Sequence, residues 1–276
     1  MPRNDESRLK VQDKGESPPI QDTSSLLNFV IPTEFIELPT QGKFYPPDHP
    51  LHDCDTVEMR YMTAKETDIL TSKSLLKQGL AVDRMLESLF VDKNVKASHL
   101  FIGDKNALIL AARVNGFGSS YEAQVSCMNC GTTAEHAFEL NEVKPKEIPE
   151  NIKFSENGTF FIKLPKTEVE VECRLLTGED EKYLSKLAEK KKRLKLPATA
   201  LTDQYKKIIV SLNTVSDRST VEEFVDIMPA QDAQHLRKEY ELARPDMDMS
   251  YSYECEACNA SNQVDIPFSA NFFWPD

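Results

Sequence analysis

The chain has 276 residues, of which 40% are hydrophobic and 28% charged, so it can bury the core of one large domain or two smaller ones. Its formal net charge of −12 argues against general nucleic-acid binding and against docking on anionic lipid, because both need a basic face. An acidic surface of this kind suits solubility and contacts with basic protein partners.

The N-terminal region predicts two segments of different character. Residues 1–26 are polar and charged, which predicts a disordered tail, and they lack the apolar core of a signal peptide. No apolar run approaches the roughly 20 residues that span a bilayer, so we expect a cytosolic protein without a membrane contact. Residues 27–56 are richer in apolar side chains, but their prolines exclude a regular helix, and we expect an extended, proline-rich arm.

This arm either packs on its own domain or reaches a neighbouring protein, and the sequence leaves both readings open. Apolar side chains in a segment that forms no regular helix are suited to gripping a partner. The candidates for a partner contact are Phe35, Ile36, Leu38, Phe44 and Tyr45.

A helical part follows the arm. Thr63 and Glu66 have the spacing of a capping box and predict a helix start. Apolar residues at spacings of three and four predict a second helix over 82–90. Asp104 is expected to cap a third helix over 105–114, which the asparagine–glycine pair after it should end.

The middle of the chain predicts a linker, a β-hairpin and a run of helices. Residues 144–157 are polar and contain prolines, as linkers do. Two strand-like segments then predict a hairpin, and the second alternates glutamate with valine as a half-buried strand should. Thr177 is expected to cap the first helix, and Ser219 with Glu222 forms a capping box for a later one. A further helix is predicted over 201–212.

The strongest chemical signal is two cysteine pairs, Cys127 with Cys130 and Cys255 with Cys258. Two cysteines separated by two residues can point at one metal ion from a tight turn, and zinc prefers four such thiolates at tetrahedral corners. The residue after each pair is glycine or asparagine, which tolerate the positive φ expected there. Strand-like sequence flanks both pairs, which is the layout of a zinc ribbon built from two β-hairpins.

The two pairs are unusually far apart, because residues 131–254, which number 124, separate them. A compact ribbon has about 15–20 residues there. Either the hairpin and helices are inserted into the ribbon, or the pairs bind separately, and the matched flanks favour the insertion. A disulfide or thioredoxin-like redox pair fits less well, since both pairs sit between strands. Four cysteines would close the site, so the predicted zinc is structural.

No other group of residues predicts chemistry. Cys54 and Cys173 stand alone and read as ordinary, partly buried cysteines. His136 lies near a cysteine pair, but we interpret it as a solvated strand residue. The glycine-rich stretch 115–120 follows a helix and lacks the lysine of a phosphate loop. No catalytic constellation remains, so we expect no enzyme and no small-molecule substrate.

Three motifs resemble a baseplate protein family of T-even-type contractile-tailed phages. They are ELPTQGKFYP at 37–46, VEMRYMTAKETDIL at 57–70 and GDKNA at 103–107, the last followed by an arginine-containing helix and then a cysteine pair. They are fairly specific in combination and cover residues 37–140. The FFWP sequence at 272–275 is compatible with longer members of that family.

The resemblance implies a component of the baseplate hub or a factor that helps the hub assemble, without enzymatic activity and without a nucleic-acid substrate. Its partners would be other baseplate or tail proteins. It would act in the host cytoplasm during assembly and, as a permanent subunit, in the tail baseplate of the virion. Two rivals stay open: a tail assembly chaperone absent from the mature virion, and a zinc-ribbon module that binds nucleic acid, against which the net charge argues.

We therefore predict an α+β fold with a helical N-terminal part, a split four-cysteine zinc ribbon of two β-hairpins, and an inserted β-hairpin plus helical segment. The expected divisions are a disordered tail at 1–26, the arm at 27–56, the helical part at 57–120, the split ribbon at 121–143 and 249–276, and the insertion at 144–248.

Overall fold

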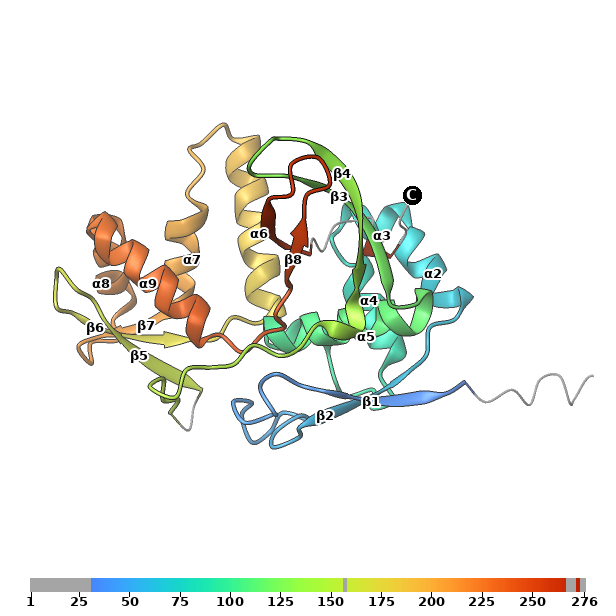
Figure 1. The fold of residues 1–276 in the computed structure, drawn as a ribbon. Coiled ribbons are helices and arrows are strands. Elements are labelled where there is room, and N and C mark those ends of the chain that lie inside the picture. Colours follow the sequence, from blue (N-terminus) through green and yellow to red (C-terminus); the bar gives the residue numbers. More distant parts are fainter. Residues whose placement is uncertain (1–30, 156–157, 267–271, 274–276) are drawn as a thin grey trace, which may run out of the picture. The chain divides into compact units, whose positions relative to one another are not determined.

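A computed structural model of the chain describes residues 31–155, 158–266 and 272–273 (Figure 1). The chain divides between Pro32 and Thr33, and residues 33–276 form one compact unit, here called the main unit. The predicted tail at 1–26 lies outside the described residues. Everything below concerns the main unit.

The main unit begins with a two-stranded antiparallel sheet in which Phe35 pairs with Glu58. The strands are β1 (Thr33–Glu37) and β2 (Thr56–Arg60). The segment between them folds into successive turns, so within residues 31–55, the described part of the predicted arm before β2, the one strand is β1. These turns are held against the core by Asp104, whose carboxylate accepts hydrogen bonds from the amide of Thr40 at 3.0 Å and the hydroxyl of Tyr45 at 2.7 Å.

Five helical segments follow the first sheet. They are α2 (Ala64–Thr71), α3 (Lys73–Lys77), α4 (Ala81–Leu89), the 3-10 turn η2 (Ala97–His99) and α5 (Ile102–Phe117). At the start of α2, the Glu66 carboxylate accepts from the Thr63 amide at 2.9 Å, as the capping box predicts. The predicted cap of α5 is wrong, because Asp104 lies inside the helix and uses its carboxylate to bind the turns after β1.

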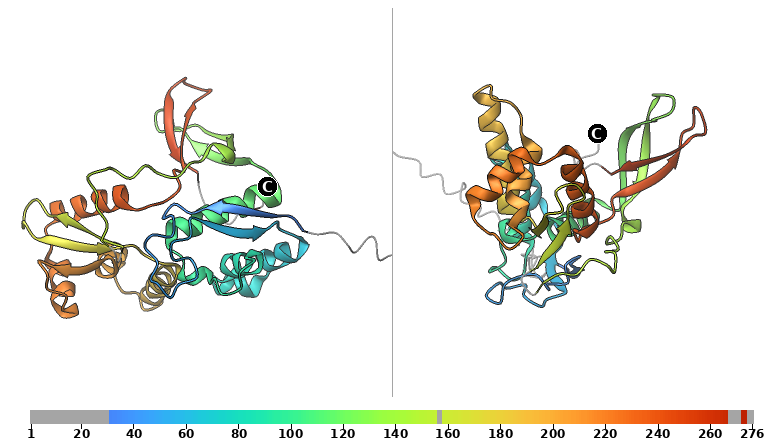
Figure 2. Two further views of the ribbon diagram at one scale, coloured as in Figure 1. Left: turned by 90° about the horizontal axis from the view of Figure 1, so that it is seen from below. Right: turned by 90° about the vertical axis from the view of Figure 1, so that its left-hand side faces the viewer.

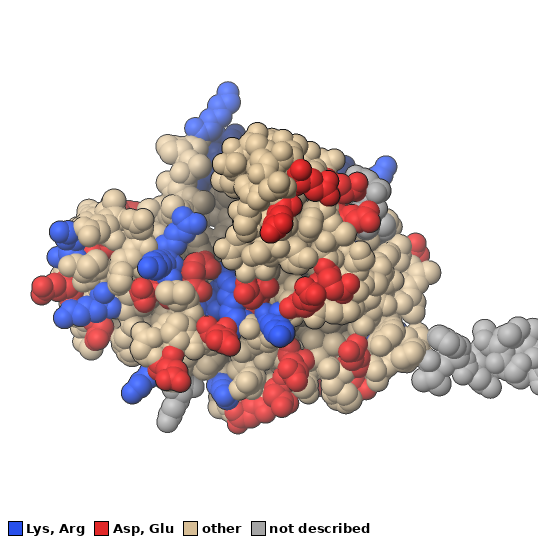
Figure 3. Space-filling model, in the orientation of Figure 1, with Lys and Arg blue, Asp and Glu red and all other residues tan. Residues whose placement is uncertain are grey.

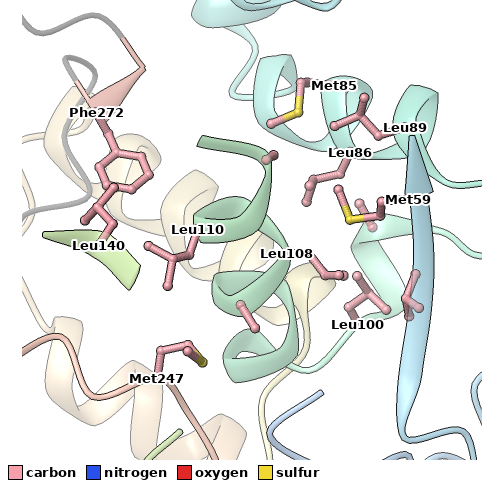
Figure 4. Close-up of a cluster of buried hydrophobic side chains, with 14 of the residues drawn as sticks. Met59, Met85, Leu86, Leu89, Leu100, Leu108, Leu110, Leu140, Met247 and Phe272 are labelled. Atoms are coloured by element: carbon pink, nitrogen blue, oxygen red, sulfur yellow. The ribbon is translucent and has the colours of Figure 1, made fainter. Parts of the chain in front are cut away.

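Helix α5 is the centre of the first apolar cluster (Figure 4). Leu108 on this helix packs among residues of β2, α4 and the segment after η2, while Leu110 faces Leu140 and Phe272. Arg113 is buried as well, and its guanidinium donates to the carbonyl oxygens of Phe272 at 2.7 Å, Gly118 at 2.6 Å and Ser120 at 3.0 Å. The helix thus ties the C-terminal segment to the N-terminal half of the chain.

Two separate β-hairpins leave this core side by side (Figure 2). The first consists of β3 (Ser120–Ser126) and β4 (Thr133–Glu139), followed by the turn η3 (Leu140–Glu142). The second consists of β8 (Ser250–Glu254) and β9 (Ser261–Asp265). Each is antiparallel, and each carries one cysteine pair in its turn.

The chain between the hairpins forms a three-stranded sheet with four helices. Its elements are β5 (Thr159–Lys163), β6 (Glu170–Arg174), α6 (Gly178–Arg193), α7 (Ala200–Ile208), β7 (Ile209–Leu212), α8 (Arg218–Ile227) and α9 (Ala230–Ala243). The predicted β5–β6 hairpin is confirmed. The expected helix over 201–212 is wrong at its end, because residues 209–212 form a third strand that pairs with β6. The first two of these residues, Ile209 and Val210, are β-branched and so favour a strand. The capping box at Ser219 is also wrong, since Asp217 caps α8 by accepting from the Thr220 amide.

This segment has its own apolar cluster, which includes Val171, Ile208 and Leu236. It meets the first cluster along α5 and α6, where the Lys105 ammonium lies 3.0 Å from Asp83 and 2.8 Å from Glu181. The predicted α+β class is confirmed, with two apolar clusters inside one compact unit.

Candidate metal centre

The turns of the two hairpins bring the four predicted cysteines together. The β3–β4 turn supplies Cys127 and Cys130, and the β8–β9 turn supplies Cys255 and Cys258. All four sulfur atoms lie within 4.8 Å of one another. The long separation in sequence therefore does not separate the pairs in space.

Both turns have the same backbone geometry. The Cys127 carbonyl accepts from the amide of Gly131 at 2.9 Å, and the Cys255 carbonyl accepts from the amide of Asn259 at 2.7 Å. Gly131 has a φ of 73° and Asn259 a φ of 54°, the left-handed conformation that the sequence predicts at both positions. This repeated turn points both sulfurs of each pair toward the other hairpin.

The distances between the sulfur atoms fit one tetrahedral ion. Cys127 Sγ lies 3.7 Å from Cys258 Sγ, and Cys130 Sγ lies 3.7 Å from Cys255 Sγ. Four sulfurs about 2.3 Å from a central zinc ion would lie about 3.8 Å apart. A disulfide would need about 2.05 Å, so the pairs are arranged as ligands and all six cysteines of the chain are free thiols.

Hydrogen bonds at the first turn favour the thiolate form. Those from backbone amides, with Cys130 the strongest donor, lower the pKa of the Cys127 thiol to about 6. Hydrogen bonding to Thr132 lowers the pKa of Cys130 in the same way. In the second turn, by contrast, backbone hydrogen bonds from Ala257 and Cys258 are outweighed by burial and by hydrogen bonds with neighbouring thiols, which raise the pKa of Cys255 to about 11. The side-chain amide of Asn129 lies 3.6 Å from Cys258 Sγ, so a residue of the first turn also reaches a sulfur of the second.

Asn262 is a site residue that the sequence analysis missed. It is buried on β9, and its side-chain oxygen accepts from the backbone amide of Met128 at 3.0 Å, while its nitrogen donates to the Ala260 carbonyl at 2.8 Å. One side chain thus fixes the first cysteine turn to the second hairpin. An isolated asparagine after the second pair gives no signal in the sequence that could have found it.

The interpretation of His136 as a solvated strand residue is wrong, because its ring is partly enclosed by aromatic side chains. Its ring lies between the two hairpins, with centroids 5.0 Å from Phe138, 5.5 Å from Tyr251 and 5.2 Å from Tyr253. The face of β4 that carries His136 would be exposed in an isolated hairpin. The second hairpin packs on this face, so the His136 ring contacts the aromatic rings of β8. The histidine belongs to the packing of the hairpins and not to the set of ligands.

A closed set of four thiols can hold one metal ion and leaves no coordination position for a substrate. Among the described residues, this is the one group of three or more cysteine, histidine or acidic side chains close enough to share an ion. Cys54 is half-buried and Cys173 is buried, and neither lies near the centre.

The candidate partner residues of the arm separate into two groups. Leu38 and Tyr45 are buried in the first apolar cluster. Ile36 and Phe44 are half-buried, while 64% of Phe35 is exposed. Of the five, Phe35 is the side chain most available to another protein.

Comparison with known proteins identifies one family. The family model described as "T4 bacteriophage base plate protein" matches residues 31–274, which include both cysteine pairs and the segment between them. No curated protein and no solved structure matches the chain. Among the described residues, no helix is both long and apolar enough to cross a membrane.

Proposed function

This chain belongs to the T4 bacteriophage base plate protein family, and on that premise we propose that it serves in the baseplate hub, as a subunit or as a factor in hub assembly. It acts by binding other tail proteins and not by catalysis. The observation that carries the proposal is the extent of the family match, which covers residues 31–274 and so includes nearly the whole main unit.

The four-cysteine centre supports a structural role for zinc within this function. The sulfur spacing fits a tetrahedral ion, and four protein ligands leave no open position for chemistry. Zinc bound there joins strands near residue 130 to strands near residue 255. The ion holds the end of the chain against its middle and keeps the surfaces of the main unit in one arrangement.

Metal analysis tests the zinc site. Protein purified without added chelator should contain one zinc ion per chain, and Cys255→Ser should lose it. Cys54→Ser is the matched control, because Cys54 lies outside the centre and the variant should keep its zinc. Unchanged zinc content in Cys255→Ser would exclude the four-thiolate site.

The location of the protein tests the role in the hub. Mass spectrometry of purified virions should find the chain in the tail baseplate if it is a permanent subunit. Its absence from virions, together with its presence on assembly intermediates, would identify the alternative, a tail assembly chaperone. Salt-dependent DNA binding by the purified chain would instead support the nucleic-acid rival.

The arm contributes a second test. Phe35 lies in β1 with most of its side chain exposed, which is the reason to propose it as a partner contact. Phe35→Ser should reduce virion yield while the purified variant folds normally. Phe161→Ser is a suitable control, since Phe161 is 55% exposed on the unrelated strand β5. Equal yields from the two variants would remove the arm from the proposal.

A further inference from the structure

The connection between α6 and α7 carries a concentration of positive charge in an acidic protein. Residues 190–196, here called the basic tip, have the sequence KKKRLKL, with five basic residues and no acidic one. The rest of the chain therefore has a net charge of −17. Figure 3 shows blue side chains projecting where α6 ends and α7 begins in Figure 1.

The helix dipole explains only part of this charge. Basic residues in the last turn of a helix are favourable because the C-terminal carbonyls carry partial negative charge. This accounts for Lys190 to Arg193, which are in the last turn of α6. It does not account for Lys195, which lies beyond the helix, or for Leu194 and Leu196, which are 54% and 53% exposed.

The tip is held in place by its own contacts. The Lys191 ammonium lies 2.6 Å from the carboxylate of Asp203 and also donates to the Thr199 hydroxyl. These bonds join the end of α6 to the start of α7. The remaining four basic side chains are exposed: Lys190, Lys192, Arg193 and Lys195.

A surface of opposite character covers β1, β2 and the turns between them. Residues 33–60, here called the acidic sheet, contain six acidic and two basic residues. Five of the acidic side chains are exposed: Glu34, Glu37, Asp48, Asp53 and Asp55. The exposed ring of Phe35 lies in the same strand as two of them. Each surface thus combines an excess of charge of one sign with exposed apolar side chains.

These two surfaces cannot meet within one chain. Figure 1 shows β1–β2 on the side of the main unit opposite the α6–α7 connection, and Figure 3 shows acidic side chains over β1–β2. Two copies of the chain, however, can bring them together. We propose that the basic tip of one copy docks on the acidic sheet of the next, with Leu194 and Leu196 packing beside Phe35. Such a head-to-tail contact closes into a ring or extends as a filament.

A second copy fits the tip better than nucleic acid does. Surfaces that bind single strands place aromatic rings against the bases, and residues 190–201 contain no aromatic side chain. Exposed leucines between lysines instead suit a protein surface that offers both carboxylates and an apolar contact. The inference deepens the proposed function, on which it rests, by naming the partner of the arm around Phe35.

Sedimentation velocity of the full-length, zinc-loaded chain tests the contact. At roughly 0.1 M salt the screening length is about 10 Å. Salt at this concentration weakens the repulsion between whole acidic molecules but screens the attraction between opposite charges in contact much less. We expect the sedimentation coefficient to rise with protein concentration. Raising the salt to roughly 0.5 M should weaken the association about tenfold. A chain that stays monomeric up to roughly 100 µM would overturn the inference, because we expect a contact used in assembly to have a dissociation constant in the micromolar range or below.

Charge reversal identifies the surfaces. One variant reverses the tip with Lys192→Glu, Arg193→Glu and Lys195→Glu, and another reverses the sheet with Glu37→Lys, Asp48→Lys and Asp55→Lys. Each alone should weaken association at least tenfold, and an equimolar mixture of the two should restore it. The matched control changes Lys73, Lys77 and Lys96 to Glu, which alters the net charge as the tip variant does but at exposed sites elsewhere.

The remaining outcomes separate this inference from its alternatives. Equal weakening by the control, or a mixture that stays monomeric, would overturn it. Binding of a DNA duplex of about 20 base pairs that depends on the tip, without self-association, would assign the tip to nucleic acid. A monomeric chain that still enters virions would refute the self-contact and leave the proposed function standing. A self-associating chain that is absent from both virions and assembly intermediates would support the self-contact and refute the proposed function.

Discussion

The two cysteine hairpins and the segment inserted between them reach stability by different means. Each hairpin has only two strands, and such hairpins are marginal by themselves. Near α5 they share the first apolar cluster, but beyond Val125 and Tyr253 the buried side chains of the turns are the thiols of Cys127 and Cys255. The inserted segment instead packs a three-stranded sheet and helices around sixteen buried apolar residues.

The difference shows that two regions of one chain can depend on different sources of stability, namely apolar burial in one and a bound ion in the other. Burial of apolar area stabilises the inserted segment, and it depends on no ligand. The cysteine turns lack enough apolar area for this, and the proposed zinc ion would supply the missing stability. The comparison predicts that a perturbation of one region should leave the other largely intact.

Removal of the metal should have the largest effect. Structural zinc contributes about 10 kcal/mol or more in small zinc-finger peptides, and here the base of each hairpin is also anchored by α5. After chelation, hydrogen exchange measured by mass spectrometry should show lost protection over 120–139 and 250–265. Protection over 159–212 should persist. Equal loss in both regions would mean that the ion stabilises the whole main unit and that the comparison is wrong.

Leu236→Ala should have the converse effect. Leu236 on α9 is fully buried in the second cluster, and removal of a buried leucine side chain costs about 3 kcal/mol. Urea unfolding should show this loss while the zinc content stays at one ion per chain. Leu242→Ala on the same helix is the control, since that leucine is 44% exposed and should cost less than about 1 kcal/mol. Loss of zinc from Leu236→Ala would show that the regions are coupled.

Asn262→Ala should weaken zinc binding without removing a ligand. The Asn262 side chain joins the first cysteine turn to the second hairpin through the Met128 amide. Loss of a group that orients ligands costs about tenfold in metal affinity, which competition with a chelating dye measures. Gln263→Ala alters the adjacent, exposed residue of β9 and should bind zinc as the unaltered chain does. If the two variants bind zinc equally, Asn262 has no part in orienting the ligands.

Most of the site could be predicted from the sequence because its rules are local. Two residues between cysteines, with glycine or asparagine after them, specify a turn that holds two sulfurs, whatever lies between the pairs. The sequence could not predict which side chains of one hairpin contact which side chains of the other. His136 and Asn262 acquire their roles only when a second hairpin packs against the first.

The errors in the fold have the same origin. Asp104 has the sequence position of a helix cap, but three hydrogen bonds from Thr40 and Tyr45 use its carboxylate for a contact across about 60 residues. Residues 209–212 continue a helical pattern until a neighbouring strand offers them backbone partners. Local rules fail where a distant part of the chain competes for the same group.

The smallest effect should come from the ion pair at the start of α6. The Asp180 carboxylate accepts two hydrogen bonds of 2.8 Å from Arg174 and one of 3.1 Å from the Thr177 amide. Burial alone would raise its pKa, but these hydrogen bonds outweigh burial and lower the pKa below the ordinary value of an aspartate. A carboxyl whose pKa is lowered on folding adds stability above its unfolded pKa of about 3.9 and loses it as the pH falls through the folded value.

Asp180→Asn should therefore cost about 1 kcal/mol at pH 7, and the cost should shrink below about pH 4. Urea unfolding of the inserted segment measures it, with the difference between variant and unaltered chain as the readout, because the other carboxyls titrate in both. Asp226→Asn is the control, since that carboxylate is 60% exposed in its pair with Lys206 and should matter little at any pH. A cost that stays constant down to pH 3 would mean that Asp180 contributes by packing and not by charge. In either case zinc content at pH 7 should be unchanged, which keeps this region distinct from the cysteine turns.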